Sequence, residues 1–76
     1  MSDIIITMPH RHTVRYVDKH TNCIIEFEVE LLTNGIAFYK RSAKILQGRL
    51  NCTAEIETQV EEWLRSKFSH VEVDHT

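Results

Sequence analysis

The sequence predicts an α+β fold, with an antiparallel sheet of four or five strands in a meander and one C-terminal amphipathic helix packed on one face. Three observations support this class. Residues 23–32 alternate apolar and acidic side chains, which is the period of a half-buried strand. The turn-forming residues 33–35 then lead into a second apolar run, as in a hairpin. Residues 53–68 instead repeat apolar side chains at helical spacing.

Two shorter strands are expected before this hairpin. Residues 3–8 are apolar and rich in isoleucine, and Pro9 ends or bends the strand because proline cannot donate to a ladder. Residues 12–18 interleave apolar and polar side chains, which predicts a second strand. The polar segment 18–22 is rich in turn formers, so we expect it to return the chain into the central hairpin.

The register of the central hairpin is predicted by matching the two faces of its strands. A two-residue Asn34-Gly35 turn would set Val29 opposite Lys40, which puts a charge on the apolar face, so we reject it. A three-residue loop over 33–35, with its glycine left-handed, matches apolar residues with apolar ones.

This preferred register has consequences at both ends of the hairpin. Near the turn it places Leu32 opposite Ile36, with both side chains on the polar side of the sheet. Farther along it sets Arg41 opposite Phe27, a misfit that marks a bulge, an edge position or a functional residue. The apolar residues expected to be exposed at the hairpin tip are Leu32, Ile36 and Phe38.

The C-terminal third predicts one helix and a short final strand. Thr53 is a suitable N-cap, and residues 71–73 alternate as a strand does. One helix laid across the sheet is the simplest two-layer arrangement. The apolar stripe of the helix consists of Ile56, Val60, Trp63, Leu64 and Phe68.

Size and composition limit the class of protein. Residues 1–76 are expected to form a single small domain, and a chain this short buries only about 60% of its unfolded surface. Two cysteines allow at most one disulfide bond, and no apolar run approaches the roughly 20 residues of a membrane span. We therefore expect a cytoplasmic protein with reduced thiols and no contact with membranes.

No catalytic constellation is visible, so the sequence does not predict an enzyme. His10 and His12 would point the same way on an extended segment, but a structural zinc site needs about four ligands. Cys52 lies near a helix start without a histidine close in sequence to act as base. No glycine-rich phosphate loop is present. Neither a metal nor a cofactor is predicted.

Two hypotheses for function follow from weaker signals. The preferred one is a non-enzymatic interaction protein of inhibitor, immunity or adaptor type, which binds another protein through the sheet surface or the apolar hairpin tip and self-associates as a homodimer by edge-strand pairing. The alternative is a nucleic-acid-binding module, because basic residues beside an aromatic can bind phosphates and stack bases. The near-neutral net charge of −2 argues against the alternative. Its candidate residues are Tyr39, Lys40, Arg41, Lys44 and Arg49.

Overall fold

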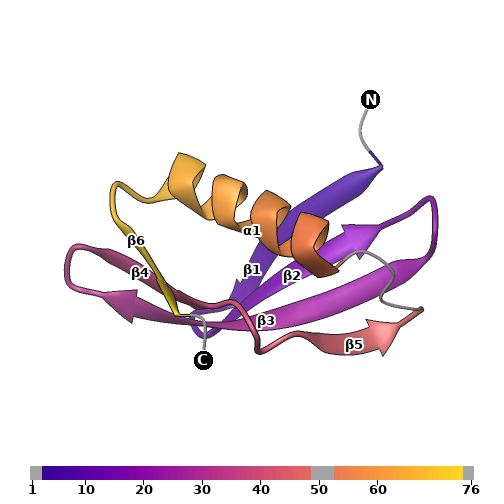
Figure 1. The fold of residues 1–76 in the computed structure, drawn as a ribbon, viewed down its shortest axis with the longest axis horizontal. Coiled ribbons are helices and arrows are strands. Elements are labelled where there is room, and N and C mark those ends of the chain that lie inside the picture. The colour runs from indigo at the N-terminus through magenta and orange to yellow at the C-terminus, as the bar shows by residue number, and fades with distance from the viewer. Residues whose placement is uncertain (1–2, 49–52, 75–76) are drawn as a thin grey trace.

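The chain folds into two layers, a curved sheet and one helix that lies along it (Figure 1). The computed structural model describes residues 3–48 and 53–74. The α+β class is confirmed, although the sheet is mixed because its last strand runs parallel to its neighbour. In chain order the elements are β1 (Ile4–His10), β2 (Thr13–Asp18), β3 (Cys23–Leu32), β4 (Gly35–Tyr39), β5 (Lys44–Gln47), α1 (Thr53–Lys67) and β6 (Val71–Asp74).

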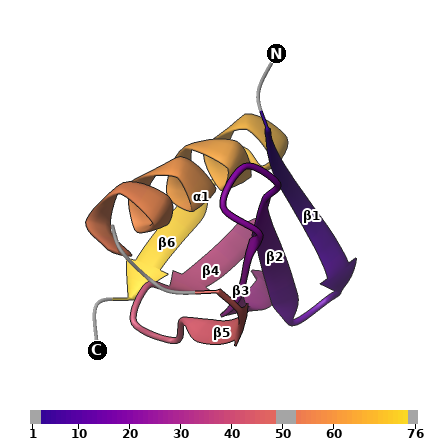
Figure 2. The same ribbon diagram turned by 90° about the vertical axis from the view of Figure 1, so that its right-hand side faces the viewer.

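The sheet is built around β3, its longest strand. The strand order is β1-β2-β3-β4-β6, and β5 pairs with β3 at the end of that strand that β4 does not reach. The predicted meander is thus confirmed from β1 to β4, while β6 returns from α1 to pair in parallel with β4. The helix lies within the curve of the sheet, on one face only (Figure 2).

The core lies between α1 and the inner face of the sheet. On the helix, the predicted stripe supplies three buried side chains, Ile56, Val60 and Leu64, while Trp63 and Phe68 pack partly buried against them. On the sheet, the rings of Phe27 and Phe38 meet edge to face, with their centroids 5.4 Å apart. Full burial of each such apolar side chain stabilises the fold by about 1.5–3 kcal/mol. The other buried sheet residues are Val14, Tyr16, Cys23, Ile25, Val29, Ile36 and Val71.

The predicted register of the β3–β4 hairpin is wrong by one residue. The turn contains only Thr33 and Asn34, so that Leu32 pairs with Gly35 and Val29 with Phe38. A shift of one residue moves every side chain of a strand to the other face. Ile36 and Phe38 are therefore fully buried rather than exposed, and of the predicted apolar tip only Leu32 keeps partial exposure.

Gly35 explains why the turn is short. Its φ is not in the left-handed region that the three-residue loop requires. A Cβ atom at Gly35 would instead lie 2.0 Å from the carbonyl oxygen of His70. That oxygen accepts a hydrogen bond of 3.0 Å from the Ile36 N–H. The glycine thus allows the chain entering β6 to approach β4 closely.

The second strand of the predicted hairpin is interrupted. Val29 pairs with Phe38 and Glu26 pairs with Lys44. Between these two pairs β3 has two residues, whereas the segment that runs from β4 to β5 has five. That segment therefore contains three extra residues. Arg41 lies in this loop, so the strand is irregular at the position where the predicted register had set Arg41 against Phe27.

Within the described ranges 3–48 and 53–74, α1 is neither long enough nor apolar enough to cross a membrane. The helix begins at Thr53, but the predicted capping role of its side chain lies outside what the structure describes.

Candidate binding surface on the open face of the sheet

The face of the sheet turned away from α1 is the candidate functional surface, and we call it the open face. None of the described elements lies over it (Figure 2). Its composition follows from alternation along β3, in which Phe27 and Val29 are buried while Glu28 and Glu30 are exposed. Polar side chains can remain on this face because it stays in contact with water.

A row of one polar and three charged residues crosses the open face where β1, β2, β3 and β5 lie side by side. The register aligns Thr7, Arg15, Glu26 and Lys44. Arg15 donates from two of its nitrogens to one Glu26 oxygen, at 2.9 and 2.7 Å. Both side chains retain contact with solvent, so this ion pair contributes at most about 1 kcal/mol. The pair does neutralise Glu26.

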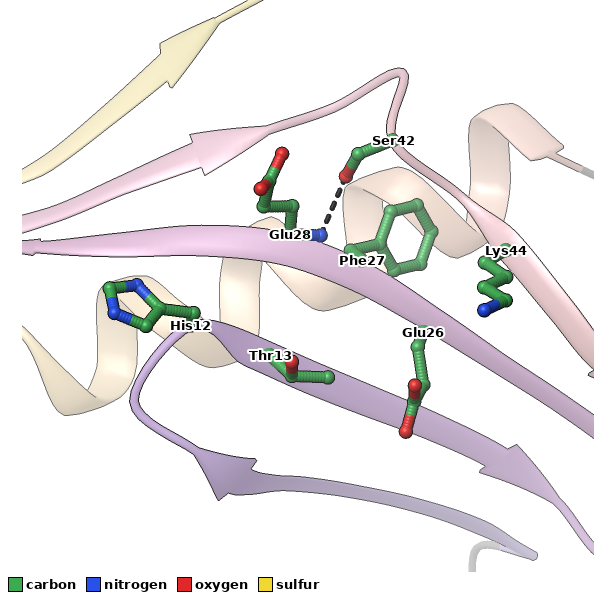
Figure 3. A pocket seen from close by; sticks show the side chains of 7 residues that line it. All are labelled: His12, Thr13, Glu26, Phe27, Glu28, Ser42 and Lys44. Carbon is green, nitrogen blue, oxygen red and sulfur yellow. Dashed lines mark hydrogen bonds between the residues drawn. The ribbon is translucent and has the colours of Figure 1, made fainter.

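A hollow of about 380 Å³, the first hollow, lies beside this row at the gap between β4 and β5 (Figure 3). Ser42 forms its upper rim in that view. The Ser42 hydroxyl accepts a hydrogen bond from the Glu28 N–H and donates one to the Tyr39 carbonyl, each of 2.6 Å. It thereby replaces the strand partner that Glu28 lacks at the interruption. The hollow is lined by His12, Thr13, Glu26, Phe27, Glu28, Ser42 and Lys44.

Replacing Ser42 by alanine is expected to destabilise the fold by about 1–2 kcal/mol, because the Glu28 amide loses its acceptor. Urea denaturation followed by circular dichroism measures this change. Ser66→Ala is the matched control, since the Ser66 hydroxyl only donates to the Trp63 carbonyl on the exposed side of α1. Equal effects of the two substitutions would contradict the bridging role of Ser42.

A second hollow, of about 450 Å³, lies farther along the open face over β3, β4 and β6. The Tyr39 hydroxyl donates to Glu30 at 2.8 Å. This hydrogen bond, with the charges of Glu30, Asp74 and Glu28 and some desolvation, raises the pKa of Tyr39 above its ordinary value. The phenol thus lies in a field of carboxylates. The lining residues are Glu30, Leu32, Ala37, Tyr39, Glu72, Val73 and Asp74.

The open face is predominantly acidic. Its register positions on β3 and β6 carry five carboxylates, and those on β2 and β5 carry two cations, Arg15 and Lys44. Because Arg15 is bound to Glu26, the excess of negative charge lies toward the second hollow. The five carboxylates are those of Glu26, Glu28, Glu30, Glu72 and Asp74.

The residues of the nucleic-acid hypothesis are not gathered on one surface. Lys40 is directed toward α1, where its ammonium lies 3.9 Å from a carboxylate oxygen of Glu61. Tyr39 and Lys44 are on the open face but line different hollows. Arg41 is exposed in the loop between β4 and β5, and Arg49 lies outside the described residues.

Sequence reasoning missed the contribution of β6 to this surface. Alternation in residues 71–74 did indicate that Glu72 and Asp74 share one face. The sequence did not indicate which strand β6 would pair with. In the structure β6 pairs with β4, so that Glu72 lies beside Ala37 and Asp74 beside Tyr39. An antiparallel meander does not contain this parallel pairing.

The remaining groups considered for chemistry are the two cysteines and the possible metal ligands. Cys23 is buried in the core, and desolvation, with a contribution from Asp18, raises the pKa of its thiol. Cys52, the other cysteine considered above, is outside the described residues. Among residues 3–48 and 53–74, no group of three or more histidine, cysteine or acidic side chains is arranged to hold a metal ion.

Comparisons of the chain with protein-family models, with curated proteins and with solved structures found no match. The interpretation of the open face therefore depends on its own geometry and charge.

Proposed function

We propose that this chain is a non-enzymatic protein-interaction module of inhibitor, immunity or adaptor type, which binds the basic surface of another protein through its open face. The single observation that carries the proposal is the charge of this uncovered face, five carboxylates against two cations. Charge complementarity of this kind steers association and selects partners. A cytoplasmic location is part of the proposal.

The two hollows suit the side chains of such a partner. Carboxylates accept the paired N–H groups of arginine, and lysine binds them as a point charge. In the second hollow, Glu30, Glu72 and Asp74 surround Leu32 and Ala37. A lysine or arginine could therefore lay its aliphatic stem on the apolar residues while its charged end meets the acids.

The same charge distribution disfavours nucleic acid at this face. Phosphate groups approaching the second hollow would meet three carboxylates, and that repulsion opposes the phosphate contacts on which such binding depends. The basic residues of the alternative hypothesis would need another surface. Nuclease treatment in the experiment below distinguishes the two cases.

The test is capture of the partner by tagged parent protein and by a Glu28→Lys/Glu72→Lys variant, from host lysate with and without nuclease treatment. Both side chains are exposed, so the variant is expected to fold. We expect the parent to retain a basic protein that the variant loses. Binding of the purified partner should weaken as salt concentration rises, because salt screens the exposed carboxylates of the open face from the cations of the partner.

Glu55→Lys/Glu62→Lys on the exposed side of α1 is the matched control. Each double substitution changes the net charge from −2 to +2, since every Glu→Lys replacement adds two charges. Equal loss of the partner in both variants would show a nonspecific effect of net charge. Equal retention in both, or proteins captured only without nuclease, would overturn the proposal.

A further inference from the structure

The outer edge of β1 is a second candidate surface, separate from the acidic part of the open face. We propose that it binds a second copy of this chain, by antiparallel pairing of the two β1 strands about Ile6. The two copies would then form one continuous sheet. This inference is independent of the proposed function, because the carboxylates assigned to the basic partner lie on β3 and β6.

The direction of the peptide groups follows from the pairing of β1 with β2. The Lys19 N–H donates to the Asp3 carbonyl at 2.9 Å, so the backbone groups of Asp3 point toward β2. Ile5 and Thr7 lie two and four residues after Asp3, and their backbone groups point the same way. In an antiparallel pair, alternate residues direct their N–H and C=O groups toward the neighbouring strand. The intervening residue, Ile6, therefore directs both groups to the outer edge.

This edge lacks the features that usually prevent strands from pairing. Residues 4–8 contain no charge and no proline, whereas natural edge strands are commonly short, charged or interrupted. The other outer strands of the sheet are protected in this way. β6 has four residues and carries Glu72 and Asp74, and β5 has four residues and carries Lys44. The regular part of β1 ends before Pro9, where the register with β2 shifts.

The strand complements itself when paired about Ile6. Ile4, Ile6 and Met8 pack half-buried against the core from the edge of the sheet. A two-fold axis at Ile6 would place the two Ile6 side chains together and each Ile4 beside Met8 of the other copy. The apolar core would then continue across the interface. On the open face, Ile5, which is 41% exposed, would lie opposite Thr7 of the second copy.

These features favour a second copy over an unrelated chain. A symmetric dimer uses the same patch twice, so the patch must match itself. Residues 4–8 do so on both faces and bring no like charges together. The pairing also closes after two copies, because it consumes the β1 edge of both.

The test is sedimentation equilibrium of the parent chain and of an Ile5→Lys/Thr7→Lys variant. Both positions are exposed, and the proposed register sets each new lysine directly opposite the other. We expect a parent dimer and a dissociation constant roughly tenfold higher or more in the variant, because like charges opposite each other destabilise strand pairing. Concentrations of about 1–500 μM are needed, since a one-strand interface lies at the weak end of the protein–protein range.

An Ile5→Glu/Thr7→Glu variant keeps the test decisive. Alone it should dimerise as weakly as the lysine variant, but an equal mixture of the two variants should form a heterodimer about as tightly as the parent dimerises. Thr21→Lys/Thr33→Lys adds the same charge at exposed turns and should remain dimeric. A monomeric parent, a dimer that survives in both charged variants, or a mixture that stays monomeric although both variants are folded would overturn the proposal.

Discussion

Replacing Phe38 by alanine is expected to destabilise the fold by about 3–5 kcal/mol, because a fully buried aromatic ring is lost and a cavity remains. Phe38 is 0% exposed and contacts Phe27 edge to face. A 76-residue domain has a total stability of roughly 4–11 kcal/mol. The loss is therefore a large fraction of the total, and it unfolds the variant if the parent lies at the low end of this range. Thermal and urea denaturation measure the effect directly.

Leu31→Ala is the informative comparison, because Leu31 belongs to the same hairpin and is 45% exposed. Its truncation should cost about 1 kcal/mol or less. In the register predicted from the sequence, Phe38 would be exposed, and its truncation would cost no more than that of Leu31. A Leu31 variant less stable than the Phe38 variant would therefore argue for that register and against the one described.

Replacing Gly35 by alanine is expected to cost about 2–4 kcal/mol, through overpacking and through the loss of a backbone hydrogen bond. The added Cβ would lie 2.0 Å from the His70 carbonyl oxygen, so β6 has to move away from β4. The amides of Ile36 and Lys40 report this movement, since they donate to His70 and Asp74. Hydrogen exchange at these two amides should accelerate more than at amides between β2 and β3.

Thr33→Ala in the same turn is the control, because Thr33 is exposed and should tolerate the change within about 0.5 kcal/mol. Uniform acceleration of exchange over the whole sheet in the Gly35 variant would indicate global unfolding rather than displacement of β6. Unchanged exchange at Ile36 and Lys40 would contradict the close approach itself.

The spacing of apolar residues was sufficient to predict the strands and the helix, but not which strands pair with each other. The bounds of β3 agree with the predicted strand over residues 23–32, because alternation there is long and regular. The stripe of α1 was likewise predictable from helical spacing. These patterns report which side of an element is apolar, and a long period-two run leaves little ambiguity about that side.

The hairpin register could not be predicted in the same way, because the deciding contact is distant in sequence. Gly35 was interpreted as a residue that supplies a left-handed turn, whereas it is required by the approach of His70. The predicted exposure of Ile36 and Phe38 was wrong because the register that followed from this interpretation was wrong. The acidic surface was equally hidden, since Glu72 joins it only through the pairing of β6 with β4.

The position of β6 also has a consequence for synthesis of the chain. Tyr39 ends β4, and the strand that covers its free edge ends 35 residues later at Asp74. At a translation rate of about 5–20 residues per second, the ribosome needs about 2–7 s to add that segment. Pairing of β6 with β4 can therefore begin only seconds after β4 itself has been made, so β6 is the last strand to join the sheet.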